Sequence, residues 1–114
     1  MNDCIFCKII NGDIPSKKVY EDEDVFAFKD IAPKAPVHIL IVPKKHFQRI
    51  FDMNKEDISV VGKINFVAKK LAEEFGIAES GYRLVANSRP DSGQEVYHLH
   101  YHLIGGRFLG DFCD

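Results

Sequence analysis

One amphipathic segment in the middle of the chain places the strongest limit on its fold. Apolar side chains recur there at helical spacing, at Ile58, Val61, Ile64, Ala68, Leu71 and Phe75, and lysines and glutamates fill the other side. Such a stripe is typical of a helix that packs one face against a core. Asn54 is a good N-cap residue and Gly76 a good terminator, so we predict one long helix between them.

The remaining segments predict short strands and one small helix. Residues 5–10 are mostly apolar and are followed by Asn11-Gly12, which favours a short helix that stops there. Segments rich in β-branched or aromatic residues predict strands at residues 18–20, 25–28, 38–42, 82–87 and 95–104. The first two flank an acidic run, the pattern of a hairpin with a solvated turn. We therefore predict a single α+β domain over residues 1–114, with a mostly antiparallel five-stranded sheet, one long helix and a short N-terminal helix.

The charge balance and the apolar pattern exclude some classes of partner. Lys and Arg number 15 against 17 Asp and Glu, a formal net charge of −2, so neither nucleic acid nor an anionic membrane is an expected partner. The most apolar stretch, residues 37–43, is far shorter than the roughly 20 residues of a membrane helix. The N-terminus lacks the features of a signal peptide, and the 3 cysteines do not make a disulfide scaffold. We expect a cytoplasmic protein.

Three of the 5 histidines alternate along the last predicted strand. His98, His100 and His102 would share one face, because side chains alternate across a strand. Alternate positions lie about 6.6 Å apart, so one ion could join two neighbours but not all three without strain. Three solvated histidines on an open face are the less favoured interpretation, because a strand face favours β-branched and aromatic residues. The row instead suits a nucleophilic imidazole with hydrogen-bonding neighbours, as phosphate-ester or phosphoramidate chemistry requires.

The sequence around these histidines resembles a known family. Residues 98–104, His-Leu-His-Tyr-His-Leu-Ile, are similar to the H-x-H-x-H motif of the histidine-triad (HIT) nucleotide hydrolases. Other segments resemble the Hint branch of that family, the purine nucleoside phosphoramidases: residues 5–10, 13–15, 41–46, 93–97 and 105–107. The resemblance runs over residues 4–107 and implies a HIT-like fold.

The resemblance also implies roles for individual residues. The middle histidine, His100, would attack the α-phosphorus and carry a nucleotidyl intermediate that water hydrolyses. His102 would hydrogen-bond the phosphate or its bridging oxygen, and His38 would support the other two. The implied nucleotide-binding residues are His100 and His102 together with Phe6, Ile9, Phe28, Asp30, Ile31, Asn87, Gly93, Gln94, Glu95 and Val96. Among them Asp30 would accept hydrogen bonds from the ribose hydroxyls.

Residue type alone leaves plainer interpretations open for some of these positions. Ile9, Phe28 and Ile31 are apolar residues of the kind that mostly fill a core. Asp30 could cap a turn before Pro33, and His38 could be a hydrogen-bonded core histidine.

Cys4 and Cys7 form a C-x-x-C motif at the start of the chain. A redox pair is disfavoured because thioredoxin-type motifs lie near a βαβ pattern. Two thiols packed as small hydrophobes is a second interpretation. Some HIT proteins, however, bind zinc through this motif and two histidines, and the residues that match are Cys4, Cys7, His46 and His98. Two thiolates and two imidazoles make a closed tetrahedral site, so this zinc would be structural.

The expected activity is hydrolysis of purine nucleoside 5′-phosphoramidates of the AMP-amine or AMP-lysine type, or of aminoacyl-adenylates. The expected ligand is a purine nucleotide such as AMP or GMP or an adenosine-type ligand, and the family implies a homodimer. A dinucleoside polyphosphate hydrolase and a regulatory nucleotide-binding module acting through a protein partner remain alternatives. Residues 105–107 favour the Hint branch over a dinucleoside polyphosphate hydrolase. The intact histidine triad counts against a module that only binds nucleotides. Glu95 stands where animal relatives carry a serine near the leaving group.

Overall fold

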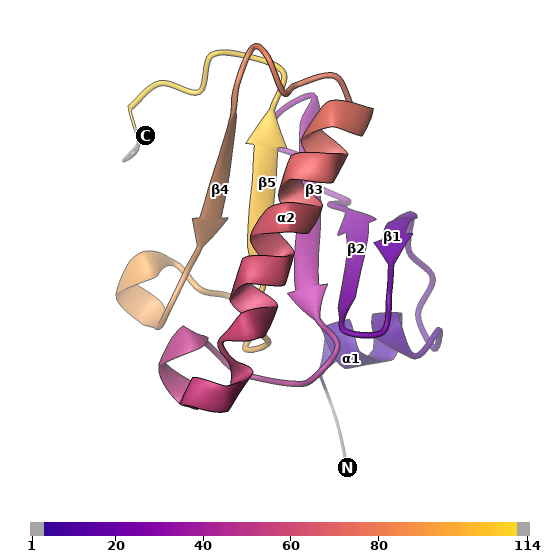
Figure 1. The fold of residues 1–114 in the computed structure, drawn as a ribbon, viewed down its shortest axis with the longest axis vertical. Helices are drawn as coiled ribbons and strands as arrows, with labels where there is room; N and C mark the ends of the chain where they lie inside the picture. The colour runs from indigo at the N-terminus through magenta and orange to yellow at the C-terminus, as the bar shows by residue number, and fades with distance from the viewer. Residues whose placement is uncertain (1–3, 112–114) are drawn as a thin grey trace.

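The protein is built on a five-stranded antiparallel sheet with the strand order β1-β2-β3-β5-β4 (Figure 1). The structure, a computed structural model, describes residues 4–111. The strands are β1 (Lys18–Glu21), β2 (Val25–Lys29), β3 (Val37–Pro43), β4 (Tyr82–Ala86) and β5 (Tyr101–Gly105). The predicted α+β class and the number of strands are confirmed.

The pleat of the strands sends alternate side chains into two separate cores. One face packs against α2 (Ser59–Glu74), which crosses the sheet in Figure 1. The strand residues in that core include Val25, Ala27, Ile39, Ile41, Tyr101 and Leu103. The opposite face packs against α1 (Ile5–Ile10). Its strand residues alternate with those of the first core and are Phe26, Phe28, Leu40 and Val42. His38 and His102 share this second face, so the alternation directs them away from α2.

The predicted long helix begins with a separate turn. A 3-10 turn, η2 (Lys55–Asp57), precedes α2, and the Asp57 carboxylate accepts a hydrogen bond from the backbone N–H of Asn54 at 3.3 Å. Gly76 follows the helix with a φ of +75°, the left-handed conformation that ends many helices. No helix within residues 4–111 is long and apolar enough to cross a membrane.

The last strand is shorter than the sequence predicts, because β5 begins at Tyr101 rather than at Glu95. Tyr101 pairs with Ile41 on one side and with Ala86 on the other, and the register of both ladders ends there. Residues 94–100 are therefore not paired with a strand and follow an irregular path. Of the three alternating histidines only His102 lies on the strand, so the predicted strand around His98 and His100 is wrong. The predicted alternation itself is confirmed. Leu99, Tyr101 and Leu103 pack in the core with α2, whereas the rings of His98 and His100 contact Phe6 of α1 on the other side.

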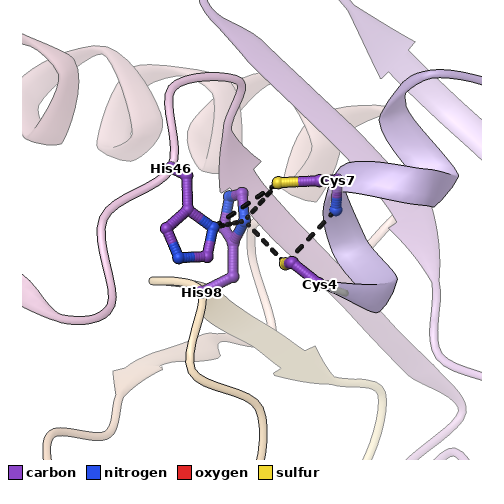
Figure 2. A group of neighbouring side chains, drawn as sticks. All are labelled: Cys4, Cys7, His46 and His98. Atoms are coloured by element: carbon purple, nitrogen blue, oxygen red, sulfur yellow. Dashed lines mark hydrogen bonds between the residues drawn. The ribbon is translucent and has the colours of Figure 1, made fainter. Parts of the chain in front are cut away.

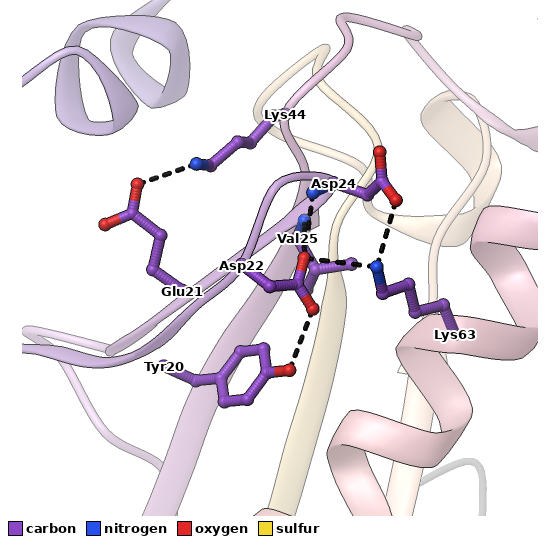
Figure 3. Close-up of polar contacts among 7 residues, drawn as sticks. All are labelled: Tyr20, Glu21, Asp22, Asp24, Val25, Lys44 and Lys63. Carbon is purple, nitrogen blue, oxygen red and sulfur yellow. Dashed lines mark hydrogen bonds and ion pairs between the residues drawn. The ribbon is translucent and has the colours of Figure 1, made fainter.

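The predicted β1-β2 hairpin is confirmed, and its acidic turn is attached to α2 (Figure 3). Asp22 Oδ1 accepts hydrogen bonds from the backbone N–H groups of Asp24 and Val25 at 2.8 and 2.9 Å. Lys63 of α2 contacts Asp24 at 2.9 Å and Asp22 at 3.5 Å. The acidic run is solvated, as predicted, but it also fixes the hairpin to the helix.

Candidate active site

A cavity of about 450 Å³ opens on the sheet face that α1 covers. It is lined by side chains from α1, the end of β2, β3 and the segment that leads into β5. The predicted site residues that line it are Phe6, Ile9, Phe28, Asp30, Ile31, Asn87, Gly93, Glu95, Val96, His100 and His102. Segments far apart in the sequence thus meet at one place. Ile31 lies at the rim with its side chain 99% exposed.

Gln94 does not line this cavity, although it is one of the predicted nucleotide-binding residues. Its side chain is buried and bonds to the backbone of three segments. The amide Nε2 donates to the carbonyls of Gln48 at 2.7 Å and Val96 at 3.2 Å, and Oε1 accepts from the N–H of Arg89 at 2.8 Å. Arg89 has a φ of +71°, which L side chains rarely adopt. In this conformation Gln94 holds the loop at the edge of the cavity.

The hydrogen bond of His100 fixes which ring nitrogen can react. Its Nδ1 lies 2.7 Å from the carbonyl oxygen of His98. A carbonyl can only accept, so Nδ1 carries the proton and Nε2 keeps its lone pair. Burial lowers the pKa of His100 and favours the neutral ring. The neighbouring Phe6 ring meets it edge-on, with ring centroids 5.0 Å apart. His100 therefore has the form that a nucleophile needs.

A second chain of hydrogen bonds fixes His102 in the opposite form. The backbone N–H of Lys34 donates to His38 Nδ1 at 3.1 Å, so the proton of His38 is on Nε2. That nitrogen lies 2.9 Å from His102 Nδ1, which must accept. The proton of His102 is consequently on Nε2. Burial and, to a smaller extent, the neighbouring histidines lower the pKa of His102 to about 4, and burial lowers the pKa of His38. His102 thus offers an N–H beside the lone pair of His100.

Asp30, His38 and His102 are close enough to suggest a metal site, with potential ligand atoms within 4.8 Å of one another. The hydrogen bonds argue against it. His38 Nδ1 already accepts from Lys34, so its Nε2 holds the proton and has no lone pair for a metal. The same Nε2 atom of His38 lies 3.3 Å from Asp30 Oδ2. We assign these three residues to a hydrogen-bond network.

A different cluster joins the N-terminal helix to the segment before β5 (Figure 2). Cys4 is the N-cap of α1, and its Sγ accepts from the backbone N–H of Cys7. His46 follows the end of β3. The Nδ1 atom of His98 lies 3.3 Å from Cys4 Sγ, 3.5 Å from Cys7 Sγ and 3.1 Å from His46 Nδ1, and Cys7 Sγ lies 3.5 Å from His46 Nδ1.

These distances fit a tetrahedral zinc ion. Sulfur and nitrogen ligands at about 2.0–2.3 Å from zinc lie about 3.3–3.8 Å from one another. The three sulfur–nitrogen distances lie in this range, and the 3.1 Å between the His46 and His98 nitrogens is just below it. His98 Nε2 lies 2.9 Å from the carbonyl oxygen of Pro43 and donates to it, which leaves Nδ1 unprotonated and directed at the cluster. Burial, the largest cause, lowers the pKa of His98 to about 4, so the ring is neutral. The donor set is that of a structural zinc site.

Comparison with known proteins agrees with this geometry. The model of the HIT domain family matches residues 11–109. The chain belongs to the HIT domain family. A purine nucleoside phosphoramidase of Escherichia coli K12 is 52% identical over 106 residues, which cover 93% of this chain and 89% of that protein. The resemblance of the sequence to HIT proteins is therefore confirmed.

Solved HIT structures have the same fold. A HIT family hydrolase from Legionella pneumophila has a TM-score of 0.91 and 51% identity, covering 94% of this chain and 96% of that one. A histidine triad protein from Clostridium difficile has a TM-score of 0.95 and 49% identity, covering 98% of this chain and 97% of that one. The protein is a hydrolase, the class of its named HIT relatives.

Some cavity residues were not predicted from the sequence. Leu40 lines the cavity beside His102, its partner in the β3-β5 ladder, and the alternation of β3 could have placed it on the face of His38. Ile5 lines the cavity from the first position of α1, and a helix of six mostly apolar residues does not by itself indicate which of its sides meets the sheet. Lys34 lies in the loop between Pro33 and Pro36, and no periodic pattern indicates where such a loop places its side chains.

Proposed function

We propose that this protein hydrolyses purine nucleoside 5′-phosphoramidates, or the related aminoacyl-adenylates, through a nucleotidyl intermediate on His100. The observation that carries the proposal is the pair of opposite imidazole forms, a lone pair on His100 Nε2 and an N–H on His102 Nε2, at one cavity. The name of the Escherichia coli relative supports the same substrate class.

The cavity offers matching surfaces for a nucleoside. Phe6, Ile9 and Phe28 form an apolar wall to which a purine ring can bind, and Phe6 and Phe28 already pack edge to face at 5.6 Å between centroids. Asp30 lies at the end of β2 beside that wall. Its carboxylate suits the two ribose hydroxyls because each oxygen has more than one lone pair. We assign the base to the apolar wall and the ribose to Asp30.

The reaction has two displacements at phosphorus. In the first, the lone pair of His100 Nε2 forms an N–P bond as the P–N bond to the leaving amine breaks. The electron pair stays on the leaving nitrogen, which takes a proton from water, while His102 Nε2–H donates to a phosphate or bridging atom. In the second, water attacks phosphorus, a P–O bond forms, the bond to His100 breaks and the surplus proton passes to solvent. The products are the free amine and the nucleoside monophosphate.

Backbone groups beside the histidines support such a transition state. Glu95 and Val96 line the cavity, and within residues 4–111 no hydrogen bond uses the backbone N–H of either residue. Donors fixed in place before the reaction stabilise charge that develops on phosphate oxygens. We assign these two amides to the phosphate.

We also propose that Cys4, Cys7, His46 and His98 hold a structural zinc ion, as their distances allow. When bound, zinc would supply a cross-link between α1 and the segment that carries His100, and all four protein ligands would leave no position for substrate. His98 then has a structural task, while its carbonyl orients the nucleophile. The homodimer and the cytoplasmic location remain proposals that rest on the family resemblance.

One comparison of substrates tests the proposed function. Purified protein is incubated with adenosine 5′-phosphoramidate and, in parallel, with a diadenosine polyphosphate. We expect faster release of AMP from the phosphoramidate. Preference for the dinucleotide would assign the protein to the other enzymatic branch, and no turnover of either would leave a nucleotide-binding module.

A further inference from the structure

A second cavity of about 390 Å³ adjoins the first on the same face of the sheet. Both cavities are lined by Lys34, Asn87 and His102, so they meet at the His102 end of the site. From there the second cavity extends over β5 and β4. Val85 pairs with His102 and Arg83 with Ile104 in the β4-β5 ladder, and all four side chains line it.

The second cavity is basic. Lys34, Arg83 and Arg107 line it, and none of its lining residues in the described chain is acidic. The half-buried Arg83 donates from Nη2 to the carbonyl of Gly110 at 2.7 Å, and Arg107 donates from Nη2 to the carbonyl of Lys34 at 2.9 Å. A guanidinium has five N–H donors, so these bonds orient each arginine and leave donors for a ligand. Ile104 and Leu109 add apolar surface.

The position of this cavity relates it to the leaving group. In the proposed reaction the nucleoside fills the first cavity and His100 attacks the phosphorus. The bond that breaks lies on the far side of the phosphorus from the attacking nitrogen, and His102 donates near it. The second cavity begins at His102. A group that departs from the phosphorus can extend into it.

We propose that the second cavity binds the leaving group and favours an amine that carries a carboxylate, that is, an amino acid linked to phosphorus through its amino nitrogen. This inference rests on the proposed function. Arginine pairs with a carboxylate through two parallel hydrogen bonds, and Arg83 carries the least solvated charge of the three because its side chain is half-buried. The exposed acidic residue Glu95 lines only the first cavity, where it disfavours a carboxylate. The negative charge of Glu95 at the first cavity and the positive charges of the second cavity thus direct an acidic leaving group towards β4.

The test uses two substrates of the same shape. Adenosine 5′-phosphate is linked through the amino nitrogen to phenylalanine or to phenylalaninamide, which differ only in carboxylate against carboxamide. We expect the wild-type kcat/KM to be higher for the carboxylate by about tenfold, the lower end of the effect of a hydrogen bond to a charged group. Arg83→Gln should bring the ratio of the two values close to one, and Arg83→Lys should leave an intermediate ratio because the charge remains.

A control variant accounts for net charge. Lys69→Gln removes one positive charge from an exposed position on α2, on the opposite side of the sheet, and should leave the ratio unchanged. Equal wild-type kcat/KM values for the two substrates would overturn the inference, whatever the variants do. So would an unchanged ratio in Arg83→Gln. Turnover of adenosine 5′-phosphoramidate without turnover of either amino acid conjugate would refute the leaving-group site alone, whereas no turnover of all three would refute the proposed function.

Discussion

His38 Nε2 lies 2.9 Å from His102 Nδ1, although the two residues are 64 positions apart in the sequence. The contact arises because β3 and β5 pair in antiparallel register, with His38 opposite Ile104 and Leu40 opposite His102. Because His102 Nδ1 accepts in this contact, the proton of the His102 ring is on Nε2. A hydrogen bond between two strands thus determines the chemistry of a residue that the motif alone leaves undetermined.

The first prediction concerns the protonation of His102. Its pKa is lowered to about 4, chiefly by burial, from an ordinary value near 6.5. NMR titration of the ring proton signals should give a midpoint near 4, with the ring neutral throughout the physiological range. A midpoint near 6.5 would show that the ring is solvated and that the contact with His38 does not persist in solution.

The same pKa difference predicts an effect on stability. Between pH 6.5 and 4 the unfolded chain binds a proton at this residue and the folded protein does not. The free energy of unfolding should therefore fall as the pH falls through this range, and the contribution is fully present above it. Urea unfolding of the wild type and of His102→Gln at several pH values measures the contribution, because the variant should lose less stability on acidification.

The third prediction concerns the nucleophile. His100→Ala should lower the turnover of adenosine 5′-phosphoramidate by orders of magnitude, since no other group at the cavity has a matching lone pair. AMP binding, measured by calorimetry, should change much less. Mass spectrometry of the wild type during turnover should find the nucleotidyl adduct on His100, and an adduct on His98 or His102 would reassign the attack.

The fourth prediction concerns the ribose. Asp30 Oδ1 also accepts from the backbone N–H of Ala32 at 2.8 Å, so Asp30→Asn is preferable to alanine because the amide oxygen can keep that turn. The variant should bind AMP more weakly, and Asp30→Ala should lose about 1.5–3 kcal/mol, the range for hydrogen bonds to charged groups. Neither variant should lose comparable affinity for a 2′,3′-dideoxy analogue. Equal losses for both ligands would limit Asp30 to the turn and to its contact with His38.

The fifth prediction concerns the metal. Protein purified without chelators should contain about one zinc ion per chain by elemental analysis. Cys4→Ser or chelation should lower the Tm by about 5 °C or more, because the binding free energy of a structural ion adds to that of folding. Cys113→Ser is the control, since Cys113 is not in the proposed set. Absence of any transition metal from such a preparation would reduce the four residues to ordinary polar contacts.

Local patterns were sufficient for most of the fold. The stripe from Ile58 to Phe75 predicted the helix, and the acidic run between two apolar segments predicted the hairpin. These predictions succeeded because each depends on neighbours a few residues away. The strand over residues 95–104 failed in its first half because a strand also needs partners, and the ladders to Ile41 and Ala86 both end at Tyr101.

By itself, the sequence determined the family, most of the helices and strands, and which histidines and cysteines could matter, because motif spacing and periodicity are properties of the chain alone. Only the tertiary structure decided what each side chain does. It turned His98 towards Cys4 and Cys7, buried Gln94 in the loop, and placed Lys34 and Arg83 beside His102. The physical reason is that hydrogen bonds and burial set the tautomer and pKa of an imidazole. The groups responsible, such as the carbonyl of Pro43 and the N–H of Lys34, belong to segments that only folding brings near.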